Sequence, residues 1–297
     1  MAGPRLLVDA PPFTPSVHGL LSVIDFRSPG DPHWQNGVTW KSLCMSASNG
    51  ATTYDECIVV TGSGAVPEPS PKADNVDNVY RGATPFTVVA RFDCSPVGNE
   101  DARQIALDAL AKTEGYQAER TFWTGLVDNK TLMFPHLAAT TQVVDGQNIV
   151  LQNPTSIVVT GSFDVASGLG QLEAALAACY DGVGVIHIPV KALPTFVAWD
   201  LVSEQNGRLV TANGNWVAAG SGYPGTSPSG VTPGVEQSWI YATGAVFGYR
   251  SDIEFTQERD AIDRALNQIQ MIAERNFVLG FDCCHVGLLV DLGVPVT

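Results

Sequence analysis

A near-continuous apolar run, VGVIHIPV at 183–190, constrains the fold of this chain more than any other segment. Such a run is typical of a β-strand that is covered on both faces. The preceding segment, 169–182, carries Leu172, Leu176 and Cys179 at helical spacing, so it predicts a helix with these three side chains facing inward. A helix that leads into a doubly covered strand predicts a layered α/β section in the middle of the chain.

Further elements are predicted on both sides of this section. TPFTVVARFDC at 84–94 indicates a strand. A long helix is expected to begin near Asn99, a good N-cap residue, and to reach Trp123, because its apolar residues recur at i, i+3 and i+4. The C-terminal part fits more than one periodicity. We expect a short helix at 256–267, followed by a β-hairpin over FVLGFDCCHVGLLVDL at 277–292.

Asn-Gly pairs predict two β-hairpins. The strands 37–46 and 51–60 flank the first pair, and Asn213-Gly214 closes the second. The first hairpin is followed by a loop rich in Pro and Asn at 62–82. The segment 238–255 indicates one strand or a pair of strands.

The charge balance argues against phosphate ligands. With 16 Lys and Arg against 30 Asp and Glu, the formal net charge is −14. Nucleic acids attract clustered cations, so the chain is a poor nucleic-acid binder, although an acidic wall around packed DNA remains compatible with this charge.

Charged residues make up only 15 % of the chain, below the about 25 % of an average soluble domain, which indicates a surface partly covered by partners.

The N-terminal segment, MAGPRLLVDAPPFTP, lacks the continuous apolar stretch of a secretory signal, and no apolar run reaches transmembrane length. We therefore expect synthesis in the cytoplasm and no membrane association. In that compartment cysteines default to reduced thiols. The sequence thus predicts six free thiols, at Cys44, Cys57, Cys94, Cys179, Cys283 and Cys284.

No motif of catalysis or cofactor binding is found. The chain contains no phosphate-binding loop, no H-E-x-x-H zinc motif and no G-x-S-x-G nucleophile motif. Cys283-Cys284-His285 could bind a metal, but buried thiols in a turn between strands explain it better, since a zinc site needs about four ligands. His187 lies in an apolar strand and is expected to be a core histidine. We predict no catalytic, cofactor-binding or metal-binding residue and no enzymatic activity.

Four residues in and beside the first hairpin are candidates for a subunit interface: Trp34, Trp40, Lys41 and Tyr54. A two-stranded hairpin buries too little surface to be stable alone, and aromatic side chains commonly anchor interfaces. We expect this hairpin to lie on a neighbouring subunit, with the aromatic rings as anchors.

The order of these segments resembles the HK97-type major capsid proteins of tailed phages, and those of actinobacterial phages in particular. The resemblance rests on three segments besides the hairpin and the long helix. They are GLGQLEAALAACYDGVGVIHIPVKAL (168–193), SWIYATGAVFGYRSDIEF (238–255) and QIQMIAERNFVLGFDCCHVGLLVDL (268–292).

The resemblance implies an α+β, HK97-like capsid fold in five parts. They are an N-terminal arm at 1–36, an E-loop hairpin with its flanking loop at 37–83, a first part of the P-domain with the spine helix at 84–126, an A-domain at 127–250, and a second part of the P-domain at 251–297. Some members of this family crosslink a Lys to an Asn. Lys41 lies in the hairpin, but no matching Asn is identified, so this chemistry is not carried over.

The implied function is that of a structural virion protein that self-assembles into the icosahedral head shell around the phage genome. Its partners would be copies of itself in hexamers and pentamers, with scaffold, portal or decoration proteins as further partners and DNA as a non-specific neighbour. Two alternatives remain open: a phage tail or neck component, and the shell protein of an encapsulin-like nanocompartment.

Overall fold

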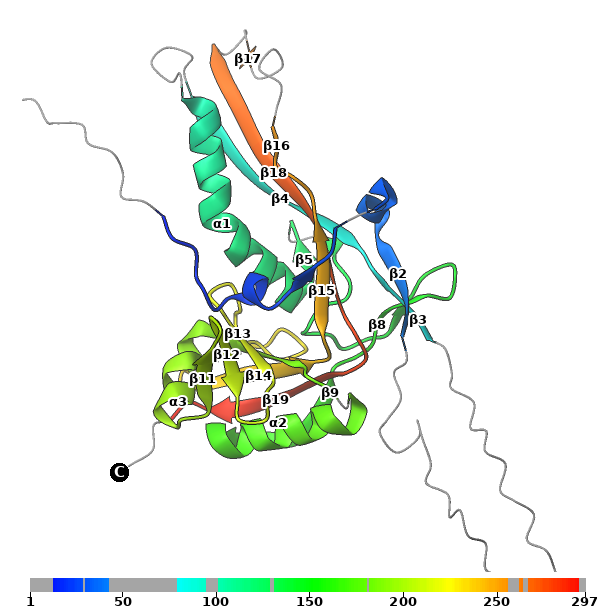
Figure 1. Ribbon diagram of the computed structural model, residues 1–297, viewed down its shortest axis with the longest axis vertical. Coiled ribbons are helices and arrows are strands. Elements are labelled where there is room, and N and C mark those ends of the chain that lie inside the picture. Colours follow the sequence, from blue (N-terminus) through cyan, green and yellow to red (C-terminus); the bar gives the residue numbers. More distant parts are fainter. Residues whose placement is uncertain are drawn as a thin grey trace, which may run out of the picture.

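The computed structural model describes residues 13–28, 30–42, 79–94, 101–128, 131–180, 182–255, 262–263 and 267–293. Within this part of the chain, a long narrow sheet rises above a compact sheet, and a smaller sheet projects to one side (Figure 1). Helix α1 (Ala102–Thr124) runs beside the long sheet, whereas α2 (Val165–Cys179) and α3 (Leu193–Ala198) pack on the compact sheet.

Strand β18 (Gln268–Phe281) is the central strand of the six-stranded long sheet. It pairs antiparallel with β4 (Pro85–Cys94) from Ile269 opposite Cys94 to Val278 opposite Pro85. On its other edge β18 pairs antiparallel with three shorter strands, β15 (Val246–Arg250), β16 (Glu254–Phe255) and β17 (Ile262–Asp263). Strand β1 (Asp25–Phe26) pairs parallel with β15.

Helix α1 covers one face of this sheet. Phe86, Val88 and Ala90 of β4 are buried and join the same core as Ala106 and Leu110 of the helix. The residues between them on β4 are exposed, as expected for a strand with one covered face. The predicted strand at 84–94 and the predicted long helix are therefore confirmed, although the helix begins at Ala102, with Asp101 and not Asn99 at its N-cap.

An ion pair fixes the helix to the central strand. The Arg275 guanidinium of β18 donates from Nη1 to both carboxylate oxygens of Glu114, each at 2.9 Å. Both side chains are mostly buried, with 17 % and 15 % of their surface exposed. A placement of α1 that separated Glu114 from Arg275 would leave each charge unpaired in a poorly hydrated site, which costs free energy. The ion pair therefore favours the observed placement of α1 over others.

The compact sheet has seven strands in the order β11-β12-β13-β10-β14-β19-β9. Every residue of β10 (Val185–Pro189) is buried, so the prediction of a doubly covered strand is confirmed. The predicted hairpin at Asn213-Gly214 is confirmed as well, because β12 and β13 pair antiparallel across it. The other strands are β9 (Ser156–Asp164), β11 (Val202–Gln205), β12 (Arg208–Thr211), β13 (Trp216–Gly220), β14 (Gln237–Thr243) and β19 (His285–Asp291).

The projecting sheet has the order β2-β3-β8-β7. Its first two strands, which we call the ribbon, are β2 (Val38–Ser42) and β3 (Val79–Ala83), and they pair antiparallel with Trp40 opposite Arg81. The described partner of β2 is thus β3, four of whose five residues lie in the predicted loop at 62–82. The predicted partner at 51–60 and its Asn-Gly turn lie outside the described residues. The remaining strands are β7 (Val143–Val144) and β8 (Val150–Gln152).

The expected C-terminal hairpin is wrong. Strand β18 lies in the long sheet and β19 in the compact sheet, so the two consecutive strands do not pair with each other. The expected helix at 256–267 is also wrong where the structure describes it, because Ile262–Asp263 forms β17 against β18. Strand β18 pairs over most of its length with β4, which is distant in sequence, and such tertiary context overrides local preference.

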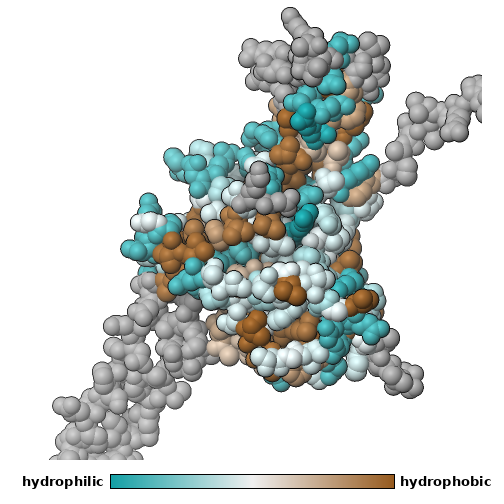
Figure 2. Space-filling model, turned by 180° about the vertical axis from the view of Figure 1, so that it is seen from behind, coloured by the Kyte–Doolittle hydropathy of each residue, from teal (hydrophilic) through white to brown (hydrophobic). Residues whose placement is uncertain are grey.

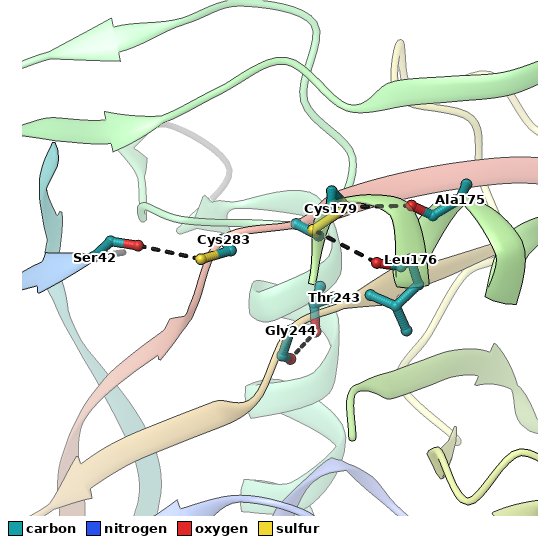
Figure 3. Close-up of a disulfide and its surroundings, with 8 residues drawn as sticks. Ser42, Ala175, Leu176, Cys179, Thr243, Gly244 and Cys283 are labelled. Carbon is teal, nitrogen blue, oxygen red and sulfur yellow. Dashed lines mark hydrogen bonds between the residues drawn. A yellow bond between two sulfur atoms is a disulfide. The ribbon is translucent and has the colours of Figure 1, made fainter. Parts of the chain in front are cut away.

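Cys179 and Cys284 form a disulfide (Figure 3), and Cys283 is disulfide-bonded as well, so the prediction of six free thiols is wrong for these three. The Cα atoms of Cys179 and Cys284 lie 5.8 Å apart, and the two residues are separated by 105 residues in the sequence. A crosslink that closes a loop of about 100 residues stabilises a fold by about 4–5 kcal/mol in the chain-entropy model. Cys94 is a free thiol, whereas Cys44 and Cys57 lie outside the described residues.

Among the described residues, no helix combines the length and the apolar character needed to cross a membrane.

The loop after β13 approaches α1 so closely that only glycine fits at position 222. A Cβ atom at Gly222 would lie 2.1 Å from the Tyr116 carbonyl oxygen, whereas a Cβ atom at Gly170 in α2 meets nothing within 4 Å. We expect Gly222→Ala to lower the free energy of unfolding by about 2 kcal/mol or more, since backbone must move. Gly170→Ala, the matched control, should raise it by up to about 1 kcal/mol because alanine favours helix. Urea unfolding of both variants measures this, and equal stabilities would contradict the packing described here.

Candidate subunit-interface region

The base of the ribbon is held by the turn between β18 and β19. The Trp40 indole nitrogen donates to Asp282 Oδ1 at 3.2 Å, and the buried Ser42 hydroxyl donates to the same oxygen at 2.6 Å. The Trp40 ring also meets Phe247 of β15 edge to face, with ring centroids 5.0 Å apart. The Asp282 carboxylate and the Phe247 ring therefore both help to fix the ribbon to the rest of the chain.

A second charge lies at the same place. Arg81 of β3 is half-buried, and this burial lowers the pKa of its guanidinium, while the negative charge of Asp282 opposes the shift. Opposite charges in a partly dry site attract more strongly than on an open surface. Asp282 was not among the residues singled out from the sequence, because its partners come from β2 and β3 and no local pattern indicates them.

Three of the four interface candidates lie in the part of the chain that the structure describes, and two of them, Trp34 and Trp40, belong to one small apolar cluster with Val278. Trp34 lies in the short 3-10 helix η2 (Pro32–Asn36), is 8 % exposed, and stacks on Tyr249 with centroids 5.9 Å apart. Trp40 is half-buried at the ribbon base, Lys41 is exposed on β2, and Tyr54 lies outside the described residues. Both tryptophans have packing partners in their own chain, so the premise that the ribbon lacks such partners is wrong. Their role as interface anchors stays a prediction.

Glu119 is a buried carboxylate that sequence reasoning also missed. It lies on α1, is 3 % exposed, and accepts hydrogen bonds from the backbone of Leu20 at 3.0 Å and of Gly222 at 2.8 Å. The Ser221 hydroxyl donates to it as well, at 3.3 Å. Burial raises the pKa of the Glu119 carboxyl, and these donors oppose the shift. The residue joins the N-terminal segment, α1 and the loop after β13.

Buried histidines occupy the junction of the two larger sheets without forming a catalytic pair. His187 is fully buried, and its two ring nitrogens lie 3.1 Å from the Tyr223 hydroxyl and 3.0 Å from the Thr243 hydroxyl. It is a core histidine as predicted. His285 contacts the Thr155 hydroxyl and the Leu137 carbonyl oxygen. Burial lowers the pKa of His187 to about 3 and that of His285 to about 4, so both imidazoles are neutral at pH 7.

Exposed apolar side chains form several separate patches, some of which Figure 2 shows on one face. A groove of about 420 Å³ lies beside the hairpin of β5 (Leu126–Val127) and β6 (Thr131–Leu132) and is lined by Phe134 and Pro228 among others. Among the described residues, the most exposed large apolar side chains are Val17, Tyr80, Val89, Val183, Val197, Val231 and Val235.

The depressed histidine pKa values predict acid sensitivity. Below pH 6.5, the unfolded chain takes up protons at His187 and His285 that the folded chain excludes until about pH 3 and 4. The free energy of unfolding should therefore fall as the pH drops from 6.5, by a few kcal/mol in total, since each pKa unit is worth about 1.4 kcal/mol. The raised pKa of Glu119 has the opposite effect, because the folded chain takes up this proton more readily than the unfolded chain and the free energy of unfolding rises as the pH falls.

The variant His187→Gln tests the contribution of His187 to this pH dependence, since the glutamine amide can donate and accept hydrogen bonds but does not titrate. Urea unfolding of both proteins between about pH 7 and about pH 5 should give a shallower decline for the variant, and Glu119 cancels in the comparison. Parallel curves would show that His187 is not held neutral.

Comparison with known proteins gives matches of structure only. No protein-family model matches the sequence, and no curated protein matches it. A solved structure described as the capsid of an empty GTA particle, computed with C5 symmetry, matches with a TM-score of 0.57 at 12% identity. The match covers 98% of this chain and 94% of that chain.

Two phage structures match over similar lengths. A chain of Mycobacterium phage Bobi gives a TM-score of 0.52 at 14% identity and covers 95% of this chain and 92% of its own. A chain of Mycobacterium phage Cain gives 0.52 at 14%, with 97% and 93% covered. Likeness at these identities shows the fold. The chain has the α+β fold of the GTA capsid protein, shared with these phage chains, and the expected capsid fold is confirmed.

Proposed function

We propose that this chain is a structural protein of a phage virion, which self-assembles into the icosahedral head shell that encloses the genome. One observation carries the proposal. The match to a GTA capsid chain extends over 98% of this chain and 94% of the other, so it is not limited to one common substructure. The GTA capsid was computed with C5 symmetry, which supports pentamers of this chain in the proposed shell. Hexamers of the same chain would complete a larger closed shell.

The division into capsid domains belongs to this proposal and takes two changes from the sheet topology. Strand β15 (Val246–Arg250) pairs with β18, so it would join the P-domain with β4 and α1. Strand β19 (His285–Asp291) pairs with β14 and β9, so it would join the A-domain. The ribbon would be the base of an E-loop that spans 37–83, and 1–36 would be the N-terminal arm.

We further propose that the chain is not an enzyme and is made in the host cytoplasm. The buried histidines support the first point, because they are held neutral by burial and contact hydroxyl groups and a carbonyl oxygen. DNA would be a non-specific neighbour, consistent with the net charge of −14. Scaffold, portal and decoration proteins are further partners under this proposal.

The mass of the assembled particle separates this function from its alternatives, since an encapsulin-like nanocompartment would give a smaller closed shell than a phage head. We expect the full-length chain, alone or with a scaffold protein, to form closed particles of uniform diameter in negative-stain images and in sedimentation. A single ring would favour a tail or neck component. A chain that stays monomeric at high concentration under both conditions would contradict self-assembly.

Lys41 tests the proposed role of the ribbon. It is exposed on β2, in a chain with nearly twice as many acidic as basic residues, so a neighbouring copy presents a mainly acidic surface. We expect Lys41→Glu to leave the subunit folded, as judged by circular dichroism, and to reduce particle yield severalfold, because like charges would meet at every copy of the contact. Lys41→Arg keeps the charge and should assemble normally.

If Lys41→Glu assembles as well as the unmodified chain, Lys41 faces solvent in the particle, and the ribbon contact must be placed elsewhere.

A further inference from the structure

The base of the ribbon and the compact sheet meet around a small cavity. It lies between Arg81 of β3, Gln152 of β8 and His285 of β19, and Trp40 and Phe281 are among its other walls. The cavity leaves about 10 Å³ for the centre of a water molecule. A bound water needs about 10–15 Å³ of such space, so there is room for one water molecule and not for two.

Two buried polar atoms of the residues around this cavity have no hydrogen-bond partner among the described residues. They are Nε of Arg81 and Nδ1 of His285. The His285 side chain belongs to a residue that is only 6 % exposed. Burial lowers the pKa of His285 to about 4, and the nearby positive charge of Arg81 adds to this shift, so the two side chains are close. A buried polar atom without a partner costs free energy, and ordered water commonly supplies the partner in native proteins.

The hydrogen bonds of the His285 ring determine which of its nitrogens carries the proton. The Leu137 carbonyl oxygen contacts Nε2 and can only accept. The Thr155 hydroxyl, 3.1 Å from the same nitrogen, already donates to that carbonyl oxygen at 2.7 Å. Nε2 is therefore the protonated nitrogen. Because the ring is neutral at pH 7, Nδ1 carries no proton and is an acceptor.

The cavity thus has one unused donor, the Nε–H of Arg81, and one unused acceptor, Nδ1 of His285. An anion would meet the lone pair of Nδ1, and a cation would meet the guanidinium charge. A water molecule suits both groups, because its oxygen accepts from an N–H and its hydrogens donate. Asn153 also lines the cavity, and its carbonyl oxygen is close enough to favour the protonated form of His285, so an acceptor for the second hydrogen lies nearby.

We propose that this cavity binds one structural water molecule, which accepts a hydrogen bond from Arg81 Nε and donates one to His285 Nδ1. The water joins β3 of the ribbon to β19, two strands that lie in different sheets. It holds the base of the ribbon in addition to the contacts of Asp282 and Phe247. The bridge lies within a single folded subunit, so it does not rest on the proposed function.

A structure of the full-length chain at a resolution that shows ordered water tests the site directly. We expect one solvent peak within hydrogen-bonding distance of both Arg81 Nε and His285 Nδ1. Crystals soaked in bromide separate water from an anion, because bromide scatters anomalously and water does not. A bromide peak in the cavity would overturn the proposal. So would a cavity without a peak in which both nitrogens are bonded to protein atoms.

The protonation of the His285 ring is a second test on the unmodified, unassembled chain. Long-range proton–nitrogen correlation spectra near neutral pH should show a proton on Nε2 and none on Nδ1. A proton on Nδ1 would overturn the water bridge, because this nitrogen would then donate and could not accept from water.

The variant Arg81→Lys removes the Nε–H but keeps the positive charge near Asp282. We expect the ribbon amides at 38–42 and 79–83 to exchange hydrogen severalfold faster in this variant than in the unmodified chain, because the ribbon loses its bridge to β19. Arg91→Lys is the matched control, since Arg91 is exposed on β4, and it should exchange at the unmodified rate.

Equal ribbon exchange in Arg81→Lys and the unmodified chain would overturn the claim that the water holds the ribbon. The structure and the spectra use the unmodified chain, so they decide the site even if Arg81→Lys fails to fold. A chain that fails to form shells would contradict the proposed function without affecting any of these results.

Discussion

The antiparallel pairing of β18 with β4 brings together segments from opposite halves of the chain, and the other parts of the structure depend on it. Ten consecutive residue pairs, from Ile269 opposite Cys94 to Val278 opposite Pro85, form the spine of the long sheet. Closing so long a loop costs chain entropy, which only the burial of apolar surface can offset. Helix α1 provides that burial, and the Glu114–Arg275 ion pair selects its position.

The same strand also connects the two larger sheets. After Phe281 the chain turns once and enters the compact sheet as β19, between β14 and β9. The turn carries the anchor for the ribbon at Asp282 and the crosslink to α2 at Cys284. A displacement of β18 would therefore be transmitted to the ribbon and to the compact sheet together. Under the proposed function, this coupling would hold the projecting parts of the subunit at fixed angles to their neighbours.

Local patterns in the sequence were sufficient for elements that depend on their own residues. The apolar run of β10, the stripe of α1 and the Asn213-Gly214 turn each predicted an element that the structure contains. The C-terminal part could not be predicted in this way. Ile269, Met271 and Ala273 fit either a strand or a helix, and pairing with β4, which is distant in sequence, decides between them. The contacts of Asp282 and Glu119 and the Cys179–Cys284 bond are likewise invisible to local patterns, because their partners are distant in sequence.

The proposed function requires that one chain builds a closed shell while the ribbon base remains anchored to its own subunit. An image reconstruction of the particle formed by the full-length chain tests both halves at once. The account predicts a closed icosahedral particle in which Trp40 and Ser42 of every copy contact Asp282 of the same chain. An open assembly, or a closed one in which Trp40 lies in a pocket of the neighbouring subunit and Asp282 is left without it, would contradict the account.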